Sequence, residues 1–345
     1  MTEIPSHIRQ HFLDQGAICA TMGSPFMERL CSALPDLLQT GVLAEAIAAW
    51  RGDPKQDALA LRLCGGLKAV AQSDAAFRAV YPPNDVSDTT FADAIIAALD
   101  THGETLVAWL TSAPQTNEVG RSAALIGGYL LLSQRYRLPL ALHEIGSSAG
   151  VNLFADQYRY SLGSAGWWGA GDVECVSTWS GACPPLDQEV QVISREGSDI
   201  APIDARDPDA CARMLAYIWA DQPARETRAS GALAAVAASN VTIETAEADA
   251  WLEALAKKGL VPGAVTVIQH TVMWQYLPEE TQSLCRAAIE ALGAQANDTA
   301  PVAWLRLEMV EGDTSAAALD LTTWPGGETR RLARASFHGA WVNWA

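Results

Sequence analysis

The first segment of this chain with the character of a buried β-strand is residues 138–145, and the long stretch before it follows a helical pattern. Up to about residue 112, apolar residues recur at intervals of three and four, as in Met27, Leu30, Cys31 and Leu34. Turns such as Gly52-Asp53-Pro54 separate segments of helix length. A sheet can therefore form only from the later part of the chain. We predict an all-helical N-terminal region over residues 1–112 and an α/β domain over residues 113–345.

Strand-like and helix-like segments alternate in the second region, as parallel sheets require. We expect strands at residues 139–145, 190–194, 241–245, 264–269, 302–308, 318–323 and 331–336. We expect helices at residues 151–158, 207–217, 225–238, 248–257 and 279–292. The pattern predicts a doubly wound, mostly parallel sheet of seven strands. Residues 160–187, rich in Gly, Trp and Pro, are too irregular for a helix, and we interpret them as an insertion forming a hairpin on the rim.

Composition excludes several classes of function. Forty acidic against 23 basic residues give a net charge of −17, so neither nucleic acid nor an anionic membrane surface is an expected partner. No apolar run approaches the roughly 20 residues of a membrane span. The N-terminal residues lack the pattern of a secretory signal, so we expect a cytoplasmic protein. Seven cysteines without a CxxC pair, and no His or Cys cluster at ligand spacing, predict neither a disulfide framework nor a metal site.

The strongest chemical signal lies where the first expected strand ends. The strand ends in an acid, Glu144, and the small residues Gly146-Ser147-Ser148-Ala149-Gly150 lead into a helix. Because small residues let a ligand approach the backbone, this segment is predicted to be a ligand-binding turn. A tight turn with a purely structural role has the same appearance. The full dinucleotide pattern GxGxxG is absent, which disfavours NAD.

The turn resembles the first motif of Rossmann-like S-adenosylmethionine-dependent methyltransferases. Glu144, Gly146 and Gly150 match that motif, and Ser148 stands in place of its middle glycine. The resemblance implies that S-adenosylmethionine binds at these residues and at Asn152, which follows them.

Further matches to the same family appear in the family's order. Asp199 follows the second strand and is similar to the acid that holds the ribose hydroxyls, while Asp249 is similar to the acid that faces the adenine amino group. Asn117 and Arg121 open the helix before the first strand, and the resemblance implies that Arg121 pairs with the cofactor carboxylate. Each residue also has a structural interpretation: a turn acid for Asp199, a helix N-cap for Asp249 and a helix-start salt bridge for Arg121.

His270 and Tyr276 follow the fourth strand, at the edge that faces the transferred methyl in these enzymes. We predict that both line the acceptor side, with Trp274 or Gln275 nearby, and that His270 is either a general base or a buried core histidine. The expected activity is methyl transfer to a small-molecule acceptor. The sequence does not predict the oligomeric state.

The chain as a whole resembles an uncharacterised bacterial family, the domain-of-unknown-function family 2332. The residues that carry this resemblance are 115–121, 144–153, 156, 158, 160, 219–222, 225, 270–277 and 338–341. Membership implies a methyltransferase-like domain behind a helical region and supplies no substrate.

Two alternatives remain open from the sequence. Gly146-Ser147-Ser148-Ala149-Gly150 also fits GxSxG, the nucleophile elbow of α/β-hydrolases, with Ser148, Asp249 and His338 in the order of a catalytic triad. Against this interpretation, the elbow needs strands ahead of it, and the residues before 138 are predicted to be helical. The third class is a non-catalytic module that keeps a ligand pocket on the same fold.

Overall fold

A computed structural model of the chain describes residues 2–310 and 313–345. The chain divides into two compact units, which are described separately. One unit combines the chain up to Thr116 with Pro208–Thr227, and the other consists of Asn117–Asp207 and Arg228–Ala345. The sequence suggests a boundary near residue 112, and it gives no sign that residues 208–227 belong with the helices.

The helical unit is built from helices of 4 to 23 residues. Its helices are α1 (Ser6–Thr21), α2 (Pro25–Leu37), α3 (Gly41–Ala48), α4 (Leu59–Ser73), α5 (Ala75–Arg78), α6 (Asp88–Leu110) and α8 (Pro208–Ala216). Polar side chains cap the N-termini of α2, α5 and α6. The Ser24 hydroxyl accepts a hydrogen bond from the Met27 N–H, and Ser87 caps α6 in the same way. The buried faces of these helices form one apolar core, which includes Trp219 from the later segment.

Side chains of residues 208–227 are held inside this unit. The buried ammonium of Lys68 donates to the carbonyl oxygens of Leu215 and Ile218 and pairs with Glu226. Gly65 has no room for a side chain, because an added Cβ would lie 2.5 Å from the ring of Tyr217. The later segment is therefore an integral part of the helical core.

The second unit contains, in its described residues, a nine-stranded sheet in the order β5-β12-β11-β10-β9-β8-β1-β6-β7. The strands are β1 (Leu140–Ile145), β5 (Thr178–Gly181), β6 (Val192–Asp199), β7 (Ile243–Thr245), β8 (Val265–Thr271), β9 (Val302–Val310), β10 (Asp313–Trp324), β11 (Glu328–Ala335) and β12 (Trp341–Trp344). Strands β7, β6, β1, β8 and β9 are parallel. Strands β9 to β12 form an antiparallel meander, and β5 pairs in parallel with β12.

The predicted mixed α/β fold with a large, mostly parallel sheet behind N-terminal helices is confirmed. All seven expected strands have counterparts. The number of strands is larger than predicted because β12 and β5 extend the antiparallel edge. Both are short, with four residues each, and β5 lies in the irregular stretch that was expected to form a rim hairpin and not a strand of the main sheet.

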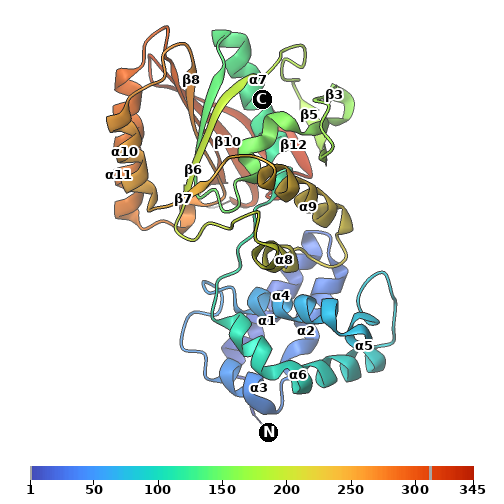
Figure 1. The fold of residues 1–345 in the computed structure, drawn as a ribbon. Coiled ribbons are helices and arrows are strands. Elements are labelled where there is room, and N and C mark those ends of the chain that lie inside the picture. The colour runs from blue at the N-terminus through green and yellow to red at the C-terminus, as the bar shows by residue number, and fades with distance from the viewer. Residues whose placement is uncertain (1, 311–312) are drawn as a thin grey trace. The chain divides into compact units, whose positions relative to one another are not determined.

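Helices cover both faces of the sheet, and alternate residues of β9 show which face each helix covers. Leu305 faces α7 (Ser122–Tyr136), where its side chain occupies the space left by Gly128. Trp304 points the other way and packs with Ile289 of α11 (Glu279–Gln295). In Figure 1, α11 runs beside α10 (Ala248–Lys258) along one side of the sheet. We call these two sides the α7 face and the α11 face.

The predicted rim insertion forms a small sheet of its own. Strands β2 (Arg159–Ser161), β3 (Trp167–Trp168) and β4 (Glu174–Val176) pair in the order β3-β2-β4, with a turn of 3-10 helix, η3 (Gly163–Ala165), between the first two. Strands β2 and β3 are antiparallel, as a hairpin requires. The remaining long helix is α9 (Pro223–Ala237).

Within the described residues, no single helix is long and apolar enough to cross a bilayer. Helices α2 and α3, bent by 96° relative to each other, have the required length and composition only as a pair.

Candidate functional site

The turn after β1 has a strained backbone that is held by several hydrogen bonds. Gly146, Ser148 and Gly150 all have positive φ angles, of 64°, 51° and 77°. This conformation is easy for glycine and costs energy for serine. The Ser147 hydroxyl donates to the Glu144 carbonyl oxygen at 2.6 Å, and the Gly150 N–H donates to the Ser147 carbonyl oxygen at 2.7 Å. The turn is thus rigid and places the start of η2 (Val151–Gln157), a 3-10 helix, at the end of β1.

Two predicted cofactor residues hold this turn in place. Asp199, the last residue of β6, accepts hydrogen bonds from the backbone N–H groups of Ser148 at 2.8 Å and Ala201 at 2.9 Å. The side-chain oxygen of Asn117 accepts from the N–H of Val151 at 3.0 Å. Both side chains therefore satisfy the hydrogen-bonding needs of backbone N–H groups at the edge where β1 and β6 end.

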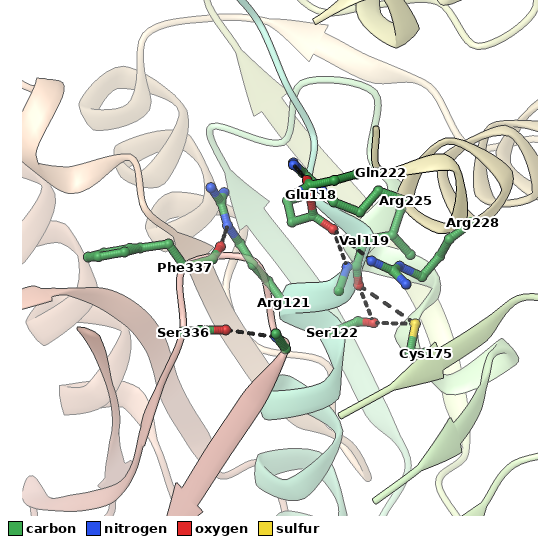
Figure 2. Close-up of polar contacts among 12 residues, drawn as sticks. Glu118, Val119, Arg121, Ser122, Cys175, Gln222, Arg225, Arg228, Ser336 and Phe337 are labelled. Atoms are coloured by element: carbon green, nitrogen blue, oxygen red, sulfur yellow. Dashed lines mark hydrogen bonds and ion pairs between the residues drawn. The ribbon is translucent and has the colours of Figure 1, made fainter. Parts of the chain in front are cut away.

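Arg121 belongs to η1 (Val119–Arg121), a short 3-10 helix that precedes α7. Its guanidinium donates to the carbonyl oxygens of Thr271, at the end of β8, and Phe337. Figure 2 shows Arg121 beside Phe337 and, on the other side of η1, Glu118 near Arg228. Glu118 accepts from the Gly120 N–H at 2.9 Å, and Arg228 lies 3.4 Å from the same oxygen. These contacts fix η1 against the ends of distant segments.

A buried polar group lies on the α7 face beside the turn. Glu144 is only 1% exposed, and its neighbour His143 contacts the ring of Trp251 on the α11 face, so Glu144 points the opposite way. Gln269, also on the α7 face, accepts a hydrogen bond from the Tyr129 hydroxyl and donates to the Asn152 carbonyl oxygen at 3.4 Å. Tyr129, Glu144, Asn152 and Gln269 thus form a polar cluster, and none of them reaches bulk water.

Burial dominates the electrostatics of Glu144. Desolvation raises the pKa of its carboxyl group to about 8; contact with Gln269 and the charge of Arg121 oppose this shift, and the charge of Asp199 adds to it. Among the described residues, one carboxyl oxygen of Glu144 has no hydrogen-bond partner, and neither do the amide oxygen and nitrogen of Asn152. A buried polar atom without a partner costs about 1–3 kcal/mol. The cluster therefore presents unsatisfied donors and acceptors next to the turn.

The predicted acceptor-side residues lie elsewhere. His270 is completely buried on the α11 face; its Nδ1 lies 2.6 Å from Glu308, and its Nε2 accepts a hydrogen bond from the Trp304 indole at 3.0 Å. Both ring nitrogens are engaged, so the ring is held as a structural element in this state. Tyr276, in the 3-10 turn η4 (Trp274–Tyr276), is 78% exposed. The structure does not bring these two residues to the Glu144 cluster.

Within the described residues, the Ser148 hydroxyl is not hydrogen-bonded to Asp249 or His338, its proposed triad partners. The Ser148 hydroxyl oxygen is buried and has no hydrogen-bond partner among the described residues. Asp249 lies in the first turn of α10. The backbone of His338 packs against Gly120, where an added Cβ would lie 2.2 Å from the His338 carbonyl oxygen. No Ser148–His338 hydrogen bond forms within the described part of the chain.

Side chains of the protein itself occupy the space over the glycines. An added Cβ on Gly146 would lie 2.9 Å from Met273, and one on Gly150 would lie 2.8 Å from Ile243. Beside the turn, a surface hollow of about 110 Å³ is lined by Ala149, by residues 202–206 and by Val236, Val241, Thr242 and Ile243. Because ligand pockets commonly measure about 300–1,000 Å³, this hollow accommodates only part of a nucleoside-sized ligand.

Sequence reasoning missed Tyr129, Gln269, Met273 and Glu308. Each lies in an apolar segment or at a strand end, and its role depends on which strands are neighbours. A usable signal is Gln269-His270-Thr271, three polar residues in succession at the end of a largely apolar strand.

The chain matches, over residues 9–344, the family described as an uncharacterized protein conserved in bacteria, DUF2332, and it belongs to this family. No curated protein matches the chain.

Proposed function

We propose that the α/β unit binds S-adenosylmethionine at the turn after β1 and transfers its methyl group to a small-molecule acceptor. The observation that carries this proposal is a set of buried polar atoms, in Glu144 and Asn152, that have no hydrogen-bond partner in the described part of the chain and lie beside a turn with three positive φ angles. Native proteins leave few such atoms unsatisfied, and a ligand that supplies the missing partners explains why they are retained.

The order of the parallel strands supports this location. Counted along the chain, strands β7, β6, β1, β8 and β9 are the third, second, first, fourth and fifth of the parallel set. The order reverses at β1. In doubly wound sheets, ligands bind beyond the carboxyl ends of the strands where the order reverses, and the turn after β1 lies at that point.

The residues around the turn suit the chemical groups of S-adenosylmethionine. The Glu144 carboxyl group and the Asn152 amide offer partners for an amino acid moiety. The hollow beside Ala149 has mainly apolar walls, with Asp204 and Arg206 also lining it, and such walls suit part of a flat base. The cofactor supplies an electrophilic methyl group on a sulfonium. The chain positions the acceptor and excludes water, and proximity alone accounts for much of the rate enhancement in such a transfer. The side chains of Met273 and Ile243 must move when the ligand approaches the glycines.

Calorimetric titration with S-adenosylhomocysteine tests the proposal. We expect saturable binding to the wild type, at least tenfold weaker binding to Glu144→Gln and Asn152→Ala, and unchanged binding to Glu328→Gln, an exposed acid on β11. A wild-type protein that shows no heat at millimolar ligand rules the proposal out. Binding without methyl transfer to any small acceptor indicates instead a non-catalytic ligand-binding module.

One observation favours the serine hydrolase alternative: Ser148 has a positive φ and a hydroxyl without a partner, as a nucleophile on a strained turn would. Two observations oppose it. The turn follows the first strand of the sheet in chain order, and no histidine contacts the hydroxyl among the described residues. Fluorophosphonate labelling decides between the two activities: labelling at Ser148 that is lost in Ser148→Ala and His338→Ala establishes the hydrolase.

A further inference from the structure

The segment that follows β8 is strained at its first residue. Val272 has a φ angle of 51°. A β-branched side chain in this region is an outlier, because its Cβ substituents crowd the backbone. Strain of this kind persists only where the surrounding structure imposes it, and it is concentrated at functional sites. Val272 is followed directly by Met273, whose side chain covers Gly146 of the turn.

The carboxylate of Glu308, on the neighbouring strand β9, holds the backbone that directly follows Val272. It accepts hydrogen bonds from the backbone N–H of Met273 at 3.1 Å and of Trp274 at 3.3 Å. The ring Nδ1 of His270 is hydrogen-bonded to the same carboxylate at 2.6 Å. The carboxylate therefore gathers three donors from one short segment, and hydrogen bonds to a charged acceptor are the stronger kind.

Two aromatic contacts orient the third donor. Because the Trp304 indole donates to Nε2 of His270, the proton of the neutral ring stands on Nδ1 and points at Glu308. The Trp274 ring stacks on His270 with ring centroids 4.8 Å apart and planes 21° apart. This stack fixes the residue that follows Met273, so the backbone of Met273 is held on both sides.

The consequence is a methionine placed over the glycine turn. An added Cβ on Gly146 would lie 2.9 Å from Cγ and 3.0 Å from Cε of Met273, so the thioether side chain packs along the bare Cα. Met273 is only half-buried, and a methionine side chain changes rotamer at low cost. The backbone is fixed while the side chain remains adaptable.

We propose that Met273 is the gate of the ligand site at the turn, and that Glu308, acting through the Met273 and Trp274 backbone and His270, is the positioning residue that holds this gate over Gly146. The inference rests on the proposed binding of S-adenosylmethionine at the turn. In this arrangement the ligand enters when the Met273 side chain swings away from Gly146, and the clamped backbone returns it afterwards.

We call the contacts of Glu308 with the Met273 and Trp274 N–H groups and with His270 the clamp. The clamp is tested without any ligand. In protein labelled with ¹³C at the methionine methyl groups, the Met273 resonance is identified by its loss in Met273→Leu. We expect it to lie away from the position of a mobile methionine in the wild type and to move to that position in Glu308→Gln. In the matched control Met309→Leu, the Met273 resonance should stay unchanged. Met309 is the exposed neighbour of Glu308. A Met273 resonance that is the same in wild type and Glu308→Gln overturns the clamp.

The gate is tested by the rates of S-adenosylhomocysteine binding. Removing a gate speeds entry and exit together, so we expect Met273→Ala to raise both the association and dissociation rates about tenfold while Kd changes less than threefold. A residue with a merely structural role would weaken binding without faster association. Unchanged rates in Met273→Ala overturn the gate.

The outcomes distinguish the gate from the proposed function. If the wild type does not bind the ligand, the proposed function fails, and the gate fails with it even where the methyl resonance confirms the clamp. If Glu308→Gln does not fold, Met273→Ala still decides the question, because it removes a half-buried side chain and leaves every clamp hydrogen bond in place.

Discussion

Two neighbouring residues of β1 respond to burial in opposite ways. Desolvation lowers the pKa of His143, on the α11 face, to about 4, and raises that of Glu144, on the α7 face, to about 8. Burial disfavours the charged form of each. Because the pKa of His143 is lowered in the folded state, this residue decreases the free energy of unfolding as the pH falls below about 6.5. Because the pKa of Glu144 is raised, it decreases the free energy of unfolding as the pH rises above about 4.5. Their effects oppose each other between these values.

Above about pH 6.5 the contribution of Glu144 outweighs that of His143. The unfolded carboxyl group is already ionised there while the folded one stays protonated until about pH 8, so the free energy of unfolding should fall by up to about 1.4 kcal/mol per pH unit. Glu144→Gln cannot ionise and should lack this decline. Urea titrations between pH 6.5 and 8.5 measure the difference, which should grow with pH. A difference that is independent of pH would show that Glu144 ionises normally.

Ligand binding should release a proton from the same carboxyl group. At pH 7 a group with a pKa of about 8 is mainly protonated, and a positive ligand group beside it favours ionisation. Titrations of S-adenosylmethionine in buffers with different ionisation heats should show the release of close to one proton at pH 7 and almost none at pH 9. Glu144→Gln should release none at either pH. Heats that do not depend on the buffer would place the ligand away from Glu144.

At the scale of elements, the strands were predictable and their neighbours were not. Alternation and apolar runs locate β1, β8 and β9 within a few residues. The partners of His270 depend on the register that sets it opposite Arg306 and brings Glu308 within reach, and no local pattern contains that register. The segment after the turn was expected to be a helix over residues 151–158, without a prediction of its type. It is the 3-10 helix η2, with non-helical angles at Phe154.

The close packing of α7 on the sheet can be tested by substituting one residue of the helix. Gly128 sits where an added Cβ would lie 2.7 Å from Leu305 of β9. Gly128→Ala should therefore destabilise the protein by about 1–3 kcal/mol, despite the better helix propensity of alanine. Gln134→Ala, on the exposed end of the same helix, should change stability by less than about 0.5 kcal/mol. Equal effects in denaturant titrations would contradict the packing of α7 described above.

For the molecule as a whole, the division into two units does not follow the order of the sequence. Tyr217, Ile218 and Trp219 pack in the helical unit although strands of the sheet lie on both sides of them in the chain. Composition indicates where helices end and strands begin, but it does not indicate that a later helix returns to the first core. That return depends on close packing, such as Tyr217 against Gly65, which a sequence pattern does not contain.

A shortened chain tests this assignment. Residues 117–345 alone retain Tyr217, Ile218 and Trp219 without the core that buries them, so they should expose apolar surface and bind the dye ANS strongly. Replacing residues 208–222 of this shortened chain with a Gly-Ser linker should remove most of the dye fluorescence. Strong dye binding that persists with the linker would indicate that the sheet unit needs the helices for its own folding.

The return of residues 208–227 to the helical core also governs the order in which the protein can fold during synthesis. A ribosome that has completed the first six helices has not yet made the segment that closes their core. When this segment emerges, β1 and β6 already exist, but β8, the other neighbour of β1, does not. The nascent chain therefore carries two unfinished cores at once, a state that favours aggregation and the recruitment of chaperones. Translation speed across residues 208–271 should accordingly affect the yield of native protein more than translation speed across the first hundred residues.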